Sequence, residues 1–238
     1  MAISVAGLTA VAPGVFVLAA FGSWVYLLAG EGLVLVDTGR RGSERRILQT
    51  LAEAGYGAES LTTLVVTHHH MDHIGSLASL QEATGARVAA HHLEAPFIAG
   101  AVPRPNPFQP PLLARAMKPI VAWSEPPPAA VDLLLQDGDG VPALPGWQVL
   151  HTPGHTAGSL SLWHQEEGVL IAGDALEYRR GRLALPSRLF TADMAQAKAS
   201  IRRLAALEVN ILLLSHFPPV TEGASALLRT LASSFDTQ

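Results

Sequence analysis

The chain has 238 residues, of which 49% are hydrophobic and 15% are charged, and its formal net charge is −4. This composition can bury a sizeable core, which excludes intrinsic disorder, and the negative balance argues against a protein that holds duplex nucleic acid through its phosphates. The absence of cysteine excludes disulfides, thiolate metal ligands and a cysteine nucleophile, so any metal chemistry must use histidine, aspartate and glutamate.

The first 30 residues carry no charge, as in an export signal or a membrane span. However, no positively charged segment precedes the apolar run, and Pro13-Gly14 and Gly22-Ser23 interrupt it. Runs such as Val15 to Leu18 and Trp24 to Leu28 favour buried strands, with a hairpin turn before the strand Leu33 to Val36. We therefore expect a cytoplasmic protein with no membrane partner.

Strands and helices alternate along the rest of the chain. Ser43 is expected to cap a helix that runs to about Ala54 and stops at Gly55. The other strands predicted are Thr63 to Val66, Arg87 to Ala90, Trp147 to Leu150, Ser159 to Trp163, Val169 to Ala172 and Asn210 to Leu214. The other helices predicted are Gly75 to Ala83, His92 to Ala99, Ala192 to Leu207 and Glu222 to Ala232. Hairpins mixed with helical crossovers predict an α/β fold in which sheets pack on each other with helices outside.

A cluster of histidines and one aspartate follows the strand that ends at Val66, in the run Thr67-His68-His69-His70-Met71-Asp72-His73. In an extended loop, side chains two residues apart share a side, so His68 and His70 can converge on one ion while His69 points away. Asp72 and His73 fall on the following turn, where they can address a second position. The remaining histidines are expected to be loop or surface residues, with His151 the best placed to support the site: His69, His91, His92, His151 and His164.

Three further candidate ligands follow apolar strands, each flanked by turn residues: His155, Asp174 and His216. Imidazole and carboxylate ligands suit zinc, iron or manganese better than calcium. We expect two divalent transition-metal ions, with zinc favoured and iron or manganese as alternatives. One ion would take His68, His70 and His155, the other would take Asp72, His73 and His216, and Asp174 would bridge both.

The order and spacing of these motifs, with Val36-Asp37-Thr38-Gly39 before them, resemble the metallo-β-lactamase fold superfamily over nearly the whole chain. The resemblance implies a single domain over residues 1–238, folded as a four-layer αββα sandwich with a dinuclear site between the sheets. It also implies that Asp37 hydrogen-bonds a ligand histidine or the nearby loop. The alternative is a turn carboxylate that caps its own loop.

With the ligand His73 and the bridging carboxylate Asp174, the ligand set resembles that of the hydroxyacylglutathione hydrolase, lactonase and phosphodiesterase branches of that superfamily. The short stretch after His216 disfavours the first branch, whose members carry an additional C-terminal helical region. The leading hypothesis is a hydrolase of small esters, lactones or thioesters, in which a hydroxide bridging the two ions attacks the carbonyl. Asp72 would handle the charge or proton of the leaving group. The expected partner is a small molecule, not nucleic acid.

Tyr178 is a second catalytic candidate, because lactonases of this fold place a tyrosine near this point to hold the substrate carbonyl. A tyrosine at a strand edge among solvated arginines is the alternative. If arginines face the cleft instead, they would bind an anionic group and favour a phosphodiesterase: Arg179, Arg180, Arg182 and Arg188. A mononuclear iron enzyme that oxidises a thiol or persulfide is the alternative from another reaction class.

The segment 101–130 holds nine of the 17 prolines and interrupts the alternation of strands and helices. It is expected to be an irregular excursion with one helix around Leu112 to Val121, either a surface linker or a lid. The helix carries an apolar face that must be buried somewhere. We favour a place over the cleft, because the segment lies between the first ligand loop and His155. A second subunit, and hence a homodimer, is the alternative.

Overall fold

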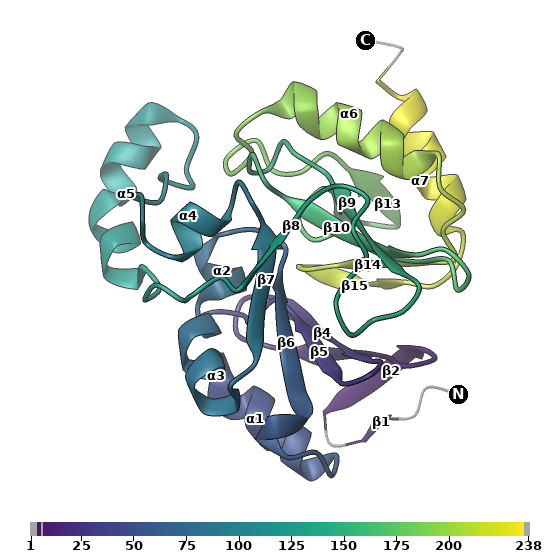
Figure 1. Cartoon of the computed structure of the whole chain (residues 1–238). Helices are drawn as coiled ribbons and strands as arrows, with labels where there is room; N and C mark the ends of the chain where they lie inside the picture. Colours follow the sequence, from purple (N-terminus) through teal and green to yellow (C-terminus); the bar gives the residue numbers. More distant parts are fainter. Residues whose placement is uncertain (1–3, 6, 236–238) are drawn as a thin grey trace.

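Two β-sheets lie between two layers of helices in the computed structural model, which describes residues 4–5 and 7–235 (Figure 1). The first sheet has eight strands whose spatial order is their sequence order. Neighbours are antiparallel from β1 to β5 and parallel from β5 to β8. Its strands are β1 (Ser4–Val5), β2 (Leu8–Ala12), β3 (Val15–Ala19), β4 (Trp24–Ala29), β5 (Leu33–Val36), β6 (Leu61–Val66), β7 (Arg87–His91) and β8 (Leu133–Leu135).

The second sheet has five strands in the order β15-β14-β11-β10-β9. Within this sheet β11 and β14 are parallel, and the other neighbouring strands are antiparallel. Its strands are β9 (Trp147–His151), β10 (Leu160–His164), β11 (Val169–Ile171), β14 (Ile211–Leu214) and β15 (Phe217–Val220). A separate hairpin of β12 (Glu177–Arg179) and β13 (Arg182–Ala184) follows the central strand β11.

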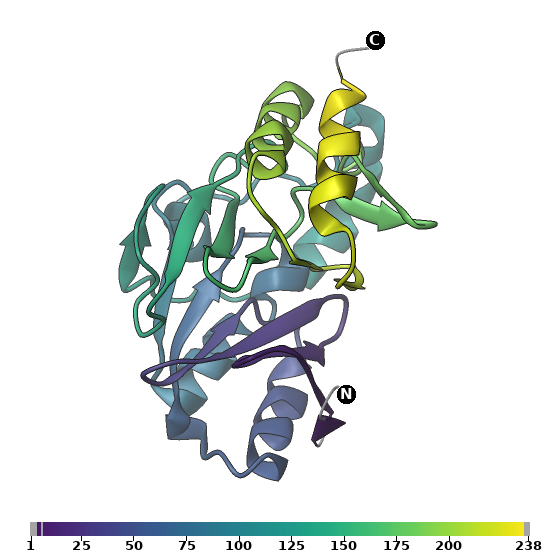
Figure 2. The same ribbon diagram turned by 90° about the vertical axis from the view of Figure 1, so that its right-hand side faces the viewer.

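Helices cover the outer face of each sheet (Figures 1 and 2). The first sheet is covered by α1 (Ser43–Glu53) and α3 (Leu77–Thr84), and the second by α6 (Met194–Ala205) and α7 (Ala224–Ser233). Shorter elements are η1 (Ala58–Ser60), α2 (Met71–Ile74) and α4 (Ala95–Ile98). Helix α5 (Pro111–Ser124) stands apart from these layers.

Side chains alternate along strands such as β4 and β5, so each of these strands contributes to two cores. Leu27 and Leu35 face the helices α1 and α3, whereas Leu28 and Val34 face the second sheet. A third core lies between the second sheet and α6 and α7. Because both faces of each sheet are buried, the strands are continuous apolar runs in the sequence. The predicted α/β sandwich, with two packed sheets and helices outside, is confirmed, and the uncharged N-terminal region contains strands β1 to β4.

The predicted cap at Ser43 is wrong. Gly42 precedes the helix, and Ser43 is its first residue. The Ser43 hydroxyl instead accepts a hydrogen bond from the Phe21 amide, while the Ser76 hydroxyl accepts from the amides of Ser43 and Glu44. The cap of α1 therefore comes from a residue distant in the sequence, which local pattern does not reveal.

Several short strands were not predicted, among them β15. Pro218 and Pro219 lie within it, and proline lacks the amide donor that a central strand needs. β15 is the edge strand of its sheet, so two missing donors are tolerated there. Among the helices of residues 7–235, none is both long and apolar enough to cross a bilayer.

Candidate metal centre

The predicted ligands lie in loops that follow strands at the meeting edge of the two sheets. His68, His70, Asp72 and His73 follow β6, His155 lies between β9 and β10, Asp174 follows β11 and His216 follows β14. The amide of Leu160 donates to the carbonyl of Thr67 at 3.0 Å, which joins the two sheets at this edge. The fold therefore brings together residues from four separate loops.

The short helix α2, which carries Asp72 and His73, is fixed by hydrogen bonds to its backbone. The Ser23 hydroxyl donates to the Asp72 carbonyl at 2.7 Å, and the Thr38 hydroxyl donates to the His73 carbonyl at 2.7 Å. Gly75 follows the helix, where a Cβ atom would lie 2.3 Å from the backbone nitrogen of Arg41. Only glycine allows the chain to pass at this distance, so this residue sets the position of α2.

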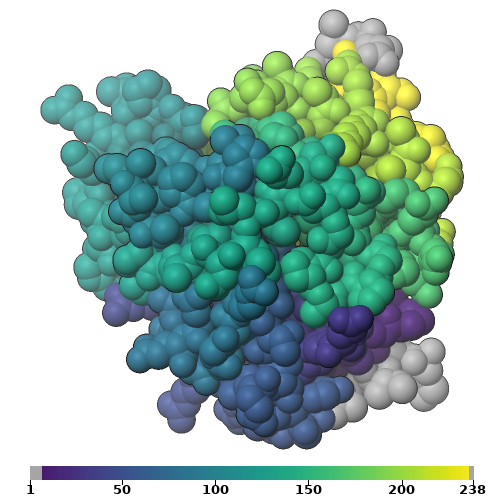
Figure 3. All heavy atoms as spheres, in the orientation of Figure 1, coloured from purple at the N-terminus to yellow at the C-terminus, as the bar shows by residue number. Residues whose placement is uncertain are grey.

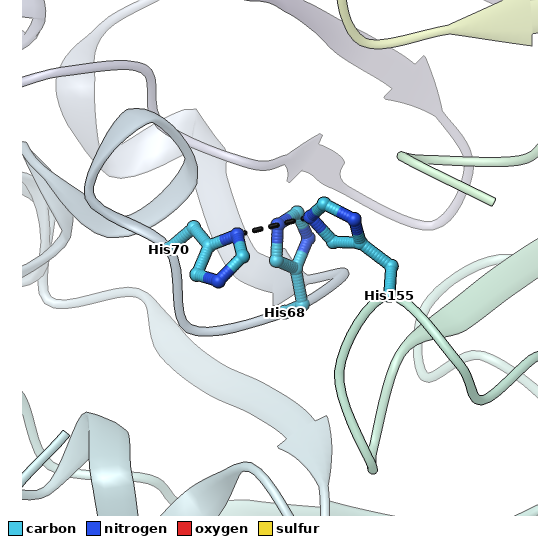
Figure 4. A group of neighbouring side chains, drawn as sticks. All are labelled: His68, His70 and His155. Carbon is cyan, nitrogen blue, oxygen red and sulfur yellow. Dashed lines mark hydrogen bonds between the residues drawn. The ribbon is translucent and has the colours of Figure 1, made fainter. Parts of the chain in front are cut away.

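Three histidines form the first group of ligands (Figure 4). His68, His70 and His155 each offer a nitrogen atom, and these atoms lie within 4.8 Å of one another. His155 Nε2 and His70 Nδ1 are 2.9 Å apart. Three imidazole nitrogens that converge in this way match the ligand set of a transition-metal ion with an open coordination position.

The second group consists of Asp72, His73 and His216, whose ligand atoms also lie within 4.8 Å of one another. Asp174 lies between the two groups. Its Oδ2 is 3.5 Å from His155 Nε2 and 3.2 Å from His216 Nε2, and its Oδ1 is 3.6 Å from His73 Nε2. The seven predicted ligands are thus brought together, and Asp174 contacts residues of both groups.

Buried polar atoms without hydrogen bonds support a cation at this place. In the described part of the chain, His68 Nε2, His73 Nε2 and Asp174 Oδ1 are among the buried side-chain atoms that have no hydrogen-bond partner. A buried polar group left unpaired costs about 1–3 kcal/mol. Ligand atoms of His68, His73 and Asp174 also lie within 4.8 Å of one another, where the two ligand groups meet, and cations bound by the two groups would satisfy all three residues.

Asp37 orients His73 from the side opposite the ligands. His73 Nδ1 donates to Asp37 Oδ2 at 2.7 Å, so Nε2 is the ring nitrogen directed at the site. The same carboxylate accepts hydrogen bonds from the amide and the hydroxyl of Thr67 at 2.8 and 2.7 Å. Asp37 adopts a φ of 61°, a left-handed conformation that is uncommon for residues other than glycine.

The electrostatics of the ligand side chains follow from their burial and from neighbouring groups. Burial, and next the nearby imidazoles, hold the pKa of His68 and of His70 well below the ordinary value, so both are neutral and can donate lone pairs. Burial alone would lower the pKa of His73, but the charges of Asp37 and Asp174 outweigh it and raise that pKa. Burial alone would raise the pKa of Asp174, but His73 and His216 hold it well below its usual range. Asp174 is therefore an anion at neutral pH.

A cavity of about 360 Å³ opens onto both ligand groups. Its walls include His70, Asp72, His155, Asp174 and His216. Two arginines, Arg40 and Arg179, reach it, and the other wall residues include Met71, Pro107, Phe108, Leu176, Glu177, Pro186, Phe190 and Phe217. Arg40 was not predicted because its position near Asp72 depends on a loop distant from the ligand motifs.

Tyr178 is not among the residues that line this cavity. Side chains alternate along β12, so Glu177 and Arg179 face the cavity while Tyr178 packs against the core under α6 and α7. Its position does not support the predicted catalytic role. Of the four arginines considered from the sequence, only Arg179 lines the cavity, and Glu177 binds its Nε.

His69 lies in a loop, as predicted, but its side chain is buried. The prediction for His91 is wrong, since this residue ends strand β7 and is buried. The His69 ring contacts Glu94, a fully buried carboxylate that was not predicted as a site residue. The His151 ring stacks on that of His91 at 4.1 Å and hydrogen-bonds the Ala157 carbonyl, so it does not contact a ligand. The contact of Glu94 with His69 could not be predicted, because a single glutamate before a short helix forms no recognisable sequence pattern.

His91 predicts a pH dependence of stability. Burial, with the adjacent rings of His151 and His92, lowers the pKa of His91 to about 4, whereas the unfolded chain takes up this proton near the ordinary value of 6.5. The unfolded state therefore binds more protons between these values, and the free energy of unfolding falls as the pH drops. We expect the free energy of unfolding to fall less between pH 7 and pH 5 in His91→Phe than in the wild type. Urea unfolding in the presence of a chelator measures this. An equal loss in both proteins would contradict this origin.

The Pro-rich segment lies beside the cavity at its beginning. Its helix α5 projects from the molecule (Figures 1 and 3). Pro107 and Phe108 line the cavity, the Phe108 and Phe190 rings lie 5.2 Å apart, and the Gln109 amide donates to the Leu189 carbonyl at 2.8 Å. No residue of α5 is buried, and both Leu112 and Trp123 are 85% exposed. The expectation that this helix buries its apolar face over the cleft is wrong; the proline-rich turn before it reaches the cleft instead.

Comparison with known proteins identifies the family. The family model described as the metallo-beta-lactamase superfamily matches residues 18–216. The chain belongs to this superfamily. It is 32% identical over 210 residues to a probable metallo-hydrolase of Bacillus subtilis (strain 168), YflN, a match that covers 80% of this chain and 77% of that protein. The chain is therefore a metal-binding hydrolase of this fold.

A second relative matches over a shorter part of the chain, and a solved structure shares the fold. A hydroxyacylglutathione hydrolase of Pseudomonas aeruginosa is 34% identical over 152 residues, which is 63% of this chain and 45% of that enzyme. The chain thus matches less than half of that enzyme's length. The crystal structure of a metallo-beta-lactamase family protein of Thermus thermophilus superposes with a TM-score of 0.70 at 28% identity, covering 96% of this chain and 81% of that chain.

Proposed function

We propose that this metallo-hydrolase binds two divalent ions, most readily zinc, and hydrolyses small thioesters, esters or lactones. The observation that carries the proposal is the shared cavity, because His70 and His155 of one ligand group and Asp72 and His216 of the other line the same space. A substrate held there would contact both ions at once. The similarity to hydroxyacylglutathione hydrolases supports thioesters within this class.

The residues of the site have distinct tasks in this proposal. Bound ions would supply an activated water molecule and polarise the substrate carbonyl. Asp174 contributes the negative charge that lies between the two ligand groups. Asp72 is partly exposed to the cavity and 3.7 Å from His216, so its carboxylate can hold the proton that the leaving group requires.

Because the cavity wall at Phe108 and Phe190 is apolar, the acyl group of the substrate would lie beside these two rings. Rings and aliphatic side chains bind uncharged surface, and Arg179 is already paired with Glu177, which weakens the case for a phosphodiesterase. The test is a comparison of kcat/KM for an S-acyl thioester, an aryl ester, a lactone and bis-p-nitrophenyl phosphate with the same metal. We expect carbonyl substrates to be preferred. A preference for the phosphodiester, or oxidation of a persulfide with one bound iron, would contradict the proposal.

Phe108→Ala tests the contact with the acyl group. Loss of a ring from the cavity wall should remove about 1.5 kcal/mol of apolar contact, which raises KM for a long-chain acyl substrate about tenfold. KM for an acetyl substrate and the metal content should change little. Leu112→Ala is the matched control, because Leu112 lies in the same segment but is 85% exposed. Equal effects of Phe108→Ala on both substrates would show that the residue does not select the acyl group.

A further inference from the structure

Glu94 is a buried carboxylate that joins the two loops from which the three-histidine group is built. It follows β7, immediately before α4, and it is 0% exposed. A carboxylate without access to water is stable only when its oxygens accept several hydrogen bonds. The two oxygens of Glu94 accept four of them, and each oxygen serves a different loop.

Oε2 of Glu94 accepts hydrogen bonds from the loop after β6. Its donors there are the amide of His69, at 2.9 Å, and the Nδ1–H of the same residue. His69 lies between His68 and His70 in the sequence, and side chains alternate in this loop. The contact therefore holds the loop from behind, on the side away from the ligand nitrogens.

Oε1 of Glu94 accepts hydrogen bonds from the loop between β9 and β10. The Thr156 hydroxyl donates at 2.8 Å and the Gly158 amide donates at 2.7 Å. Thr156 directly follows the ligand His155. A Cβ atom at position 158 would lie 2.7 Å from the Cγ and from the Oε1 of Glu94, so glycine permits this close approach.

We propose that Glu94 is a positioning residue that fixes the distance between His155 and the pair His68 and His70. This inference rests on the proposed metal binding. Glu94 belongs to neither ligand group, and its hydrogen bonds do not reach Asp72, His73 or His216. Its loss should therefore weaken the three-histidine position selectively.

The test is a calorimetric titration, in which Zn²⁺ is added to the metal-free full chain and the heat of binding is measured. Glu94→Gln keeps the size of the side chain but places an NH₂ group against two hydrogen-bond donors of one loop. It is measured in two backgrounds. His216→Ala disables the second position, and His155→Ala disables the three-histidine position. We expect zinc affinity to fall about 10–100-fold in the His216→Ala background and to change little in the His155→Ala background.

Glu44→Gln is the matched control, because Glu44 also accepts hydrogen bonds across loops, from Ser76 and Gly42, but serves the start of α1. It should lower the melting temperature without changing zinc affinity. Should Glu94→Gln fail to fold, Thr156→Val removes one of the four hydrogen bonds with little change of shape and should act in the same direction, more weakly.

Equal loss of affinity at both positions, or a lower melting temperature with unchanged zinc affinity, would overturn the inference and leave Glu94 as a general stabiliser. The proposed function fails separately. If the wild type binds zinc through the three histidines and Glu94→Gln weakens it, but no ester or thioester is hydrolysed, the positioning role stands and the hydrolase substrate class does not.

Discussion

Asp174→Asn is expected to reduce both metal content and kcat/KM by on the order of 100-fold or more. The amide is neutral, so it no longer offsets the positive charge of two ions, and one of its two atoms becomes a donor that cannot bind a cation. Asp174 contacts His73, His155 and His216, which belong to both ligand groups. Loss of the shared carboxylate should therefore weaken both positions together. Elemental analysis and steady-state kinetics on one preparation measure this.

Asp137→Asn is the control for that substitution. Asp137 pairs with Arg203 and accepts from the His151 amide, and it lies outside all groups of candidate ligands. It should keep wild-type metal content and activity. If Asp174→Asn retains two ions and full turnover, Asp174 is not a shared ligand, and the assignment of the two positions is wrong.

Asp37→Asn should have the second largest effect, a fall in zinc affinity of about 10–100-fold. His73 donates its Nδ1–H to Asp37, so Nε2 is the nitrogen that would bind the metal, which replaces any proton there. An asparagine amide turned toward His73 would favour the opposite tautomer, in which Nε2 carries the proton and cannot bind an ion. The affinity is measured by competition with a chromophoric chelator.

The effect of Asp37→Asn should be confined to the group of Asp72, His73 and His216. The Asp137→Asn control applies here too, because it makes the same chemical change away from the site. Unchanged zinc affinity with a lower melting temperature would mean that Asp37 serves the loop around Thr67 and not the ligand.

The architecture and the convergence of the ligands were accessible to sequence reasoning for a physical reason. Buried strands such as Leu33 to Val36 are unbroken apolar runs, and chemistry-bearing residues follow them directly, as His68 follows β6 and His216 follows β14. Side chains at strand ends gather at the edge of a sheet, so the spacing of motifs carries information on the site. The hairpins and crossovers between them indicated packed sheets.

Contacts between distant loops were not accessible. The hydrogen bonds of Glu94 and the approach of Arg40 to Asp72 depend on how segments pack in space, and single residues give no periodic signal. For Tyr178, in contrast, the sequence suggested a role that its position in the structure does not support. Its place after Asp174 suggested a role, but the register of β12 turns Glu177 and Arg179 to the cavity instead. A shift of one residue along a strand exchanges the two faces.

The helix α5 shows the limit of amphipathic patterns. Its sequence has an apolar face, which predicts burial, yet Leu112, Ile120 and Trp123 are exposed in the chain. A pattern indicates that a surface is apolar but does not identify what lies against it. A homodimer, the alternative considered for this apolar face, stays a prediction.

The central claim is that hydrolysis depends on two ions held by the seven residues, and one measurement tests it most directly. Metal content is determined by elemental analysis in parallel with thioester and ester turnover, while a chelator removes the ions and zinc restores them. We predict two ions per chain in the active protein, with activity lost and regained in step with them. Full hydrolytic activity with one ion or none would contradict the claim.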